Sequence, residues 1–487
     1  MTGGTLNIAE GDIHINNSGK ESKLIERGKK NNYFCPKLRT NDDLLPRGIN
    51  DLFLNVAPGA FHDSGECFDP PKCHPNTRVA VIQEILDWLD DPQSPQLVMW
   101  LHGAAGAGKS AIAQKMAQML FEQGRLSGAF FFARASTTGR SDQRRLVPTL
   151  AYQLAKFLPD TRFHIASTVV SDPTIFSLAL HTQVQDLLIH PLWLASNALS
   201  SSHNTSPRVF IIDGLDECRN PDVQCLILRV FAAAVKSMPN QLPHKLLIAS
   251  RSEIHLLAGF NEHDTAAMCR RLPLGESYNP DADIRLFLQD TFSKIKGEHH
   301  MRTSLDNAWP SEENISSLVQ KSSGQFIYAS TVVKYITSAR HHPAERLKVI
   351  LGLKPAGRND RPFAELDSLY THIFNNVEDI GLVLCILRLA LAGSFVTIPL
   401  LECNGTVYRH LLGMTVEELE LALGDLVSVI SFDRGQGWFK FLHASIPDFL
   451  LDENRSRSFY VDQPTVNLYR AECCVKVICI RTFKIRS

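Results

Sequence analysis

Short apolar runs separated by helical patterns predict an α/β fold for the first half of the chain. Charged or turn-forming residues bound the runs, which are LVMWL (97–101), GAFFFARA (128–135), RVFIIDGLDE (208–217) and KLLIASR (245–251). Runs that are apolar at successive positions are typical of strands buried on both faces, and their alternation with helices indicates a parallel sheet between helical layers. We therefore expect a mostly parallel sheet.

The segments between these runs carry apolar residues at helical spacing. The first predicted helix follows Asn76, a suitable N-cap, and places Val79, Ile82, Leu86 and Leu89 on one face. Later helices are predicted from the spacing of Ile112, Met116 and Leu120, and of Leu146, Leu150, Leu154 and Phe157.

After about residue 275 the strand pattern gives way to successive amphipathic helices. Near the C-terminal end the order is helix, strand, Gly-rich turn, strand and helix, which suits a small winged-helix unit. We expect a polar segment that is either a hairpin or disordered (1–75), the α/β domain (76–274), a helical domain (275–378), a winged-helix domain (379–460) and a tail (461–487).

Composition narrows the class of protein. The chain has 487 residues, enough for two to four domains, and its formal net charge is −1, which gives no electrostatic reason to expect nucleic acid or an anionic membrane as a partner. The first residues have no basic and apolar regions of a secretory signal, so we expect a cytoplasmic protein. The apolar run 380–401 contains Arg388 and Pro399, which favours a core helix over a stable membrane span.

The eleven cysteines are expected to be reduced in this compartment. Two groups contain several possible zinc ligands: Cys67, Cys73 and His74, and Cys473, Cys474 and Cys479. Neither has the paired Cys-x-x-Cys spacing of a structural zinc site, so we expect no zinc.

The strongest motif is GAAGAGKS (103–110), which fits G-x-x-x-x-G-K-[ST] and lies between a predicted strand and a predicted helix. In such a phosphate loop, glycines let backbone N–H groups surround phosphate oxygens, the lysine reaches the β- and γ-phosphates, and the hydroxyl ligates Mg²⁺. The predicted nucleotide-binding residues are Gly103, Gly106, Ala107, Gly108, Lys109, Ser110 and Ala111.

A second motif supplies acidic groups. The strand 208–213 ends in Asp213, which we expect to hold Mg²⁺ together with Ser110. Glu217 is the first candidate for orienting or deprotonating the attacking water, and Asp216 is the second candidate for this catalytic role. Arg251 follows a further strand and either senses the γ-phosphate or pairs with a carboxylate of this acidic cluster.

Two classes of P-loop protein are excluded by missing motifs. A GTPase would need an Asn-Lys-x-Asp motif to recognise guanine, and the chain has none. A transporter ATPase would need its signature motif before the acidic strand, whereas SSGQ (322–325) comes after that strand. The remaining motifs resemble those of NACHT-domain proteins, and of the large fungal set in particular. The resemblance covers roughly residues 60 to 460 and rests on CHPNTR, DGLDE, IASR, VPTLAYQLA, SSGQFIYAST, FAELDSLY and FLHASIPDFLLDENRS.

The resemblance implies a signal-transducing switch of the STAND class. Its members close over ADP at rest, and they open and self-associate when ATP replaces ADP, in signalling of the innate-immunity or heterokaryon-incompatibility kind. In the family a winged-helix histidine contacts the β-phosphate of ADP, and the matching position is His443. The implied cofactors are ATP or ADP and Mg²⁺, and the implied partners are further copies of the chain and an unknown sensor or effector.

Three functions stay open on the sequence alone. The leading one is a switch with slow ATP hydrolysis. The second is a non-catalytic scaffold that holds ADP permanently, or a truncated regulator of longer relatives, since the chain has no repeat array after the winged helix and no large domain before residue 76. The third is a ring-forming motor, which would hydrolyse ATP steadily.

Overall fold

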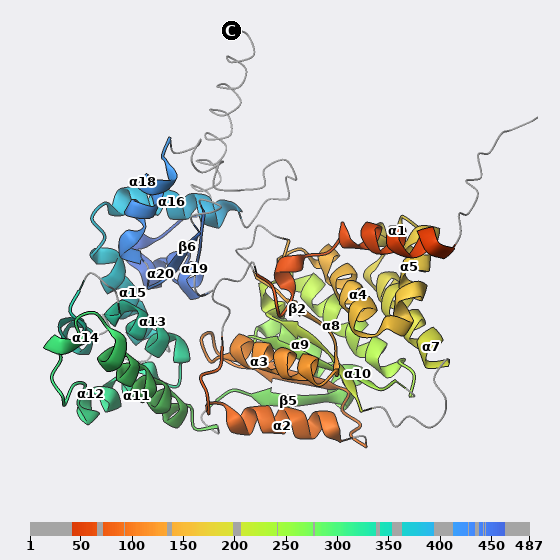
Figure 1. Cartoon of the computed structure of the whole chain (residues 1–487), viewed down its shortest axis with the longest axis horizontal. Helices are drawn as coiled ribbons and strands as arrows, with labels where there is room; N and C mark the ends of the chain where they lie inside the picture. Colours follow the sequence, from red (N-terminus) through yellow and green to blue (C-terminus); the bar gives the residue numbers. More distant parts are fainter. Residues whose placement is uncertain are drawn as a thin grey trace, which may run out of the picture. The chain divides into compact units, whose positions relative to one another are not determined.

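The protein consists of a sheet-containing part followed by a helical part. The computed structural model describes residues 41–65, 72–91, 93–133, 139–197, 206–240, 242–275, 278–337, 341–352, 363–393, 413–426, 428–433, 438–441, 443 and 445–462. Figure 1 shows the elements in chain order, with the strands of the first part between helices. The expected α/β fold is confirmed.

Five parallel strands form the central sheet in the order β2-β3-β4-β1-β5. Their bounds are Val98–His102 for β1, Leu126–Phe131 for β2, Arg208–Asp213 for β3, His244–Ser250 for β4 and Cys269–Pro273 for β5. Four of them follow the apolar runs of the sequence. Because all strands run the same way, their carboxyl ends share one edge, where parallel α/β sheets bind ligands.

Helices cover both faces of the sheet because the strands are apolar on both sides. One face carries α2 (Val79–Asp90) and α3 (Lys109–Glu122), and the other carries α4 (Leu146–Phe157) and α8 (Pro221–Lys236). The remaining helices of this part are α5 (Arg162–Ser171), α6 (Leu180–Val184), α7 (His190–Asn197), α9 (Ile254–Asn261) and α10 (His263–Met268).

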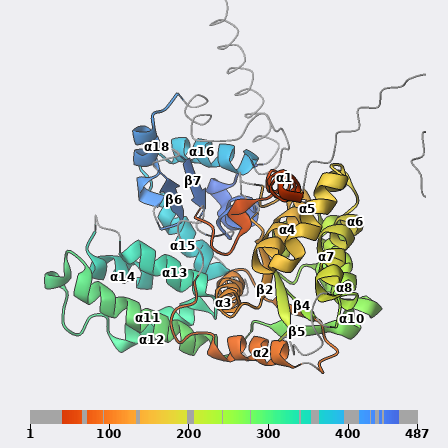
Figure 2. The same cartoon turned by 45° about the vertical axis from the view of Figure 1, so that its right-hand side comes forward.

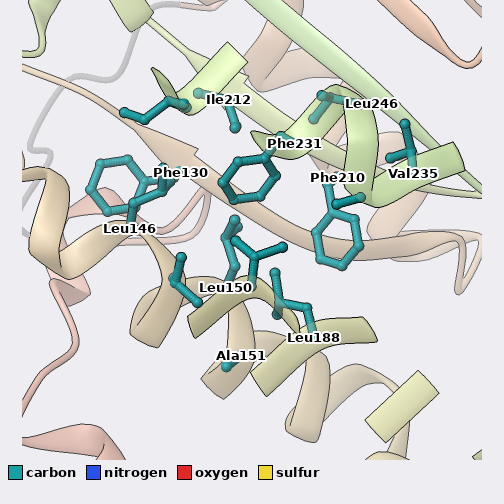
Figure 3. Packing of buried hydrophobic residues seen from close by; sticks show 14 of the residues in the cluster. Phe130, Leu146, Leu150, Ala151, Leu188, Phe210, Ile212, Phe231, Val235 and Leu246 are labelled. Atoms are coloured by element: carbon teal, nitrogen blue, oxygen red, sulfur yellow. The ribbon is translucent and has the colours of Figure 1, made fainter. Parts of the chain in front are cut away.

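Figure 3 shows the core between the sheet and α4, where the rings of Phe130, Phe210 and Phe231 pack against Leu150. Each of these side chains is at most 1% exposed. Burial of such a side chain stabilises the fold by roughly 1.5–3 kcal/mol. The strand ends that carry the predicted site therefore rest on a rigid core.

Three features of the sheet-containing part differ from the sequence predictions. Leu89 is buried and Ile82 and Leu86 pack partly buried against the core as predicted, but Val79 is 59% exposed. The fully buried positions also include Val81, Ile85 and Trp88. The predicted N-cap is also wrong, because the helix starts after Arg78, which adopts φ 58° and makes no side-chain cap. In addition, β5 has no counterpart among the predicted strands: as an edge strand it is short and carries two arginines, which do not form an apolar run.

Part of the segment expected to be a hairpin or disordered is helical. Helix α1 (Asn41–Phe53) packs closely on α5, since a Cβ at Gly48 would collide with the backbone of Ala166. Leu52 is fully buried in the same core. The alternating polar stretch at residues 1–40 lies outside the described residues.

The second part is helical and ends in a hairpin. A single apolar core runs from Ile284 to Val461. Its helices are α11 (Pro280–Glu298), α12 (Glu312–Ser322), α13 (Phe326–Ile336), α14 (Pro343–Gly352), α15 (Ala364–Asn375), α16 (Ile380–Gly393), α18 (Val416–Ala422), α19 (Ser445–Leu450) and α20 (Glu453–Ser456).

Strands β6 (Ile430–Asp433) and β7 (Trp438–Phe441) pair antiparallel and lie beside α16 and α15 in Figure 2. The order α18, β6, β7, α19 is the one predicted for this segment. Within the described ranges, no helix has both the length and the hydropathy needed to span a bilayer.

The described cysteines are free thiols: Cys73, Cys218, Cys225, Cys269 and Cys385. Among the residues that the structure describes, no three His, Cys, Asp or Glu side chains gather into a metal-binding group. The other cysteines of the two sequence groups, Cys67, Cys473, Cys474 and Cys479, fall outside these ranges.

Candidate functional site

The predicted phosphate loop connects β1 to α3 at the carboxyl edge of the sheet. Gly106 and Gly108 have φ angles of 77° and 96°, in the left-handed region that glycine adopts without strain. The ammonium of Lys109 donates to the carbonyl oxygens of Gly103 and Ala104, each at 2.9 Å. The side chain of Lys109 therefore folds back over its own loop, on the side where phosphate oxygens would bind.

Ser110 and Asp213 meet beside this loop. Asp213 ends β3, is 4% exposed and has one carboxylate oxygen, Oδ1, without a hydrogen-bond partner. Burial raises the pKa of Asp213 to about 7, and the hydrogen bond with Ser110 opposes this rise. A buried, unpartnered carboxylate oxygen next to a hydroxyl is a set of hard oxygen donors, which fits Mg²⁺.

The acidic cluster and Arg251 lie on the neighbouring strand ends. Asp216 follows β3 in a 3-10 turn (Leu215–Glu217) and is 3% exposed. It accepts a hydrogen bond from the backbone N–H of Arg251 at 3.0 Å and pairs with the guanidinium Nε at 3.2 Å. Of the two roles left open for Arg251, pairing with the acidic cluster is the one seen in this structure.

Lys109 ties these groups together electrostatically. Burial lowers the pKa of Lys109, whereas the carboxylates of Asp216, Asp213 and Glu217 act in the opposite direction. Arg251 adds to the lowering. The fold thus brings the loop lysine, the three predicted acids and the strand-end arginine into one site.

The C-terminal segment reaches the same site. Asp448 in α19 pairs with Nη1 of Arg251 at 2.6 Å. Burial lowers the pKa of His443 to about 3, and the charges of Arg251, Lys109 and Lys334 add to this effect. The charge of the loop lysine therefore reaches His443, although 334 residues separate them in the sequence. The carboxylates of Asp448 and Asp216 outweigh burial and hold the pKa of Arg251 above its usual value.

Arg78 is a site residue that the sequence analysis did not identify. Its side chain is 4% exposed, donates from Nη2 to the carbonyl of Ala107 at 2.8 Å and lies over the ring of Phe326. Its backbone N–H donates to Asp283, while its Nε and Nη1 make no hydrogen bond. The only sequence signal for this residue is its place at the end of the CHPNTR segment.

The start of α13 also covers the loop. The N–H of Ile327 donates to the carbonyl of Gly106 at 3.4 Å, and a Cβ on Gly106 would collide with the Ile327 side chain. The chain reaches this position after a left-handed turn at Ser323 and Gly324, which separates α12 from α13. Ile327, in the SSGQFIYAST segment, thus packs directly on the phosphate loop.

The family comparison matches the sheet-containing part of the chain. A family model described as nephrocystin 3, N-terminal, matches residues 79–251, which is less than half of the chain. No curated protein matches the chain significantly. The family match spans the loop, the acidic strand and Arg251.

Solved structures of origin recognition proteins are similar to the chain at low identity. The Aeropyrum pernix ORC2 protein, in complexes with ADPNP and ADP, is 12% identical with a TM-score of 0.34, over 86% of this chain and 100% of that one. Drosophila ORC bound to DNA is 12% identical with a TM-score of 0.28, over 84% of this chain and 63% of that one. Such values are too low to transfer a function. The sheet and its loop give the chain a P-loop NTPase-like fold, while the NACHT resemblance rests on the quoted motifs.

Proposed function

We propose that the protein is an ATP/ADP-dependent molecular switch of the NACHT type with slow hydrolysis. The observation that carries the proposal is the ion pair between Arg251 and Asp448, which ties the C-terminal segment to the phosphate-loop site. The charges of Arg251 and Lys109 also act on His443, which supports a place for this histidine near the same site. A nucleotide held here would contact both the sheet-containing part and the C-terminal segment. The number of its phosphates would therefore change the stability of the contact between them.

The hydrogen-bond donors and oxygen ligands of the site suggest how a nucleotide would bind. Its phosphates would lie in the loop between Gly103 and Lys109, and Ser110 with Asp213 would hold Mg²⁺, which neutralises phosphate charge when bound. Arg78 contacts Ala107 of the loop, lies over the ring of Phe326 and has two nitrogens, Nε and Nη1, without a hydrogen-bond acceptor, so we place the base near these two side chains.

The acids have different roles in this proposal. Asp216 is engaged with Arg251, so it acts as a positioning residue for the arginine. Glu217 orients or deprotonates the attacking water. Because the guanidinium of Arg251 is paired with two carboxylates, its charge is not directed at a phosphate in this arrangement, which supports a resting state with slow turnover.

Exchange of ADP for ATP is the proposed trigger. A γ-phosphate near Arg251 would compete with Asp448 for the guanidinium, which would weaken the contact between the two parts. The opened form would then self-associate and engage a sensor or effector. The coupling requires that ATP and ADP differ in affinity for the closed and open forms.

Light scattering after size-exclusion chromatography tests this function. The parent protein is expected to be monomeric with ADP and larger with a non-hydrolysable ATP analogue, and to hydrolyse ATP slowly. Glu217→Gln should keep binding and lose hydrolysis, and Lys109→Ala should lose both. Rapid turnover without a change in size would indicate a motor, and bound ADP that never exchanges would indicate a scaffold. Either result would overturn the proposal.

A further inference from the structure

Two side chains, Ser445 and Tyr370, connect His443 to the helical core. We call the C-terminal segment that carries His443 and Asp448 the lid. The backbone N–H of Ser445 donates to Nδ1 of His443 at 3.1 Å, and the Ser445 hydroxyl lies 2.9 Å from the same nitrogen. The hydroxyl of Tyr370, in α15, lies 2.7 Å from the Ser445 hydroxyl. Ser445 and Tyr370 are 1% and 0% exposed, so water does not substitute for either hydroxyl.

This arrangement fixes the tautomer of the ring. A backbone N–H can only donate, so Nδ1 of His443 must accept and cannot carry a proton. A neutral imidazole then carries its proton on Nε2. The ring is neutral near pH 7, because burial and the nearby cations hold its pKa at about 3.

The surroundings of the ring suit an anion. Lys109, Arg251 and Lys334 lie close enough to oppose a positive charge on His443, and they come from the loop, a strand end and α13. A neutral ring that presents an N–H among cations can donate to a phosphate oxygen without adding repulsion.

We infer that Ser445 and Tyr370 are positioning residues that hold His443 as the Nε2–H tautomer, so that the lid donates a hydrogen bond to a phosphate oxygen of the bound nucleotide. This inference rests on the proposed function. The backbone N–H of Ser445 sets the tautomer, and the Ser445 hydroxyl, supported by Tyr370, adds a second hydrogen bond that holds the ring in place. Without this hydroxyl the ring is held by one hydrogen bond, so its Nε2–H is less firmly directed at the phosphate.

The rate of release of a fluorescent ADP from the full chain tests this role. Ser445→Ala and Tyr370→Phe should each speed release by roughly three- to tenfold, the range for one hydrogen bond, and Ser445→Thr should restore the slow rate. In the His443→Ala background, Ser445→Ala should add nothing, because both residues act through the same ring. Tyr335→Phe is the matched control, since it removes a tyrosine–histidine hydrogen bond of 2.9 Å with His372 elsewhere in the helical part.

The outcomes separate this inference from the proposed function. If His443→Ala speeds release but Ser445→Ala adds a further increase in that background, the serine acts structurally and the inference fails while the switch stands. If His443→Ala leaves release unchanged, or the parent binds no ADP, the proposed lid contact fails as well.

A second measurement does not depend on how the variants release nucleotide. In the ¹⁵N spectrum of histidine-labelled parent protein, the signals lost in His443→Asn belong to this ring. They should show a protonated Nε2 and an unprotonated Nδ1. The opposite pattern, or an averaged one, would overturn the inference.

Discussion

Asp448→Asn should loosen the contact between the C-terminal segment and the nucleotide site. The substitution keeps the shape of the side chain and removes the charge that pairs with Arg251 at 2.6 Å. Both side chains are about one fifth exposed, at 21% and 18%, so the cost lies below the 3–5 kcal/mol of a fully buried pair. Arg251 also keeps its second partner, Asp216.

The expected magnitude follows from these contacts. A hydrogen bond to a charged group contributes about 1.5–3 kcal/mol, and we take about 2 kcal/mol for this one. If the pair exists only in the closed form, that free energy shifts the ratio of open to closed molecules by about 30-fold. Release of a fluorescent ADP, followed by stopped flow, should then be about 30-fold faster.

Asp367→Asn is the matched control for this variant. Asp367 pairs with Arg455 at 2.8 Å, and both side chains are 14% exposed, but the pair joins α15 to α20 inside the helical part. This control should lower thermal stability and leave ADP release unchanged. If Asp448→Asn releases ADP no faster than Asp367→Asn, the ion pair does not hold the lid and the reasoning is refuted.

Three further predictions concern other parts of the site and the sheet. Glu217→Gln should lower the rate of ATP hydrolysis at least tenfold with unchanged nucleotide affinity, as measured by phosphate release and fluorescence titration. Gly106→Ala should lower the melting temperature, because its Cβ collides with Ile327 at a positive φ, and Ile327→Ala should recover part of the loss; no recovery would show that backbone strain alone matters. Burial lowers the pKa of His244 to about 4, so the native state resists protonation and the free energy of unfolding should fall between pH 6.5 and 4, by about 3 kcal/mol at most. Denaturant unfolding at pH 7 and 4.5 should show a smaller fall in His244→Gln, and an equal fall would contradict this cause.

The loop and the acidic strand can be predicted from the sequence because their chemistry is local. Lys109 and Ser110 stand at fixed spacing after Gly103, and Asp213 directly follows an apolar strand. Periodicity alone therefore places these groups at the same edge of a parallel sheet. Their convergence around Lys109 follows from the sheet order.

Other features depend on contacts between distant segments. The partner of Arg251 in α19 is 197 residues away, and no local pattern connects the two positions. Arg78 adopts a left-handed backbone conformation and its guanidinium contacts Ala107 and Phe326, which a helical pattern cannot show. The buried part of α2 is wider than the predicted stripe, because Trp88, which is 1% exposed, is buried together with Val81 and Ile85.

The nucleotide that remains with the purified protein tests the central claim most directly. The protein is denatured, and the released nucleotide is identified and quantified by ion-exchange chromatography, alongside Lys109→Ala and His443→Ala. We predict ADP in near-stoichiometric amount in the parent, none in Lys109→Ala and less in His443→Ala. A parent protein without nucleotide, or a His443→Ala variant that retains as much ADP as the parent, would contradict a lid closed over ADP.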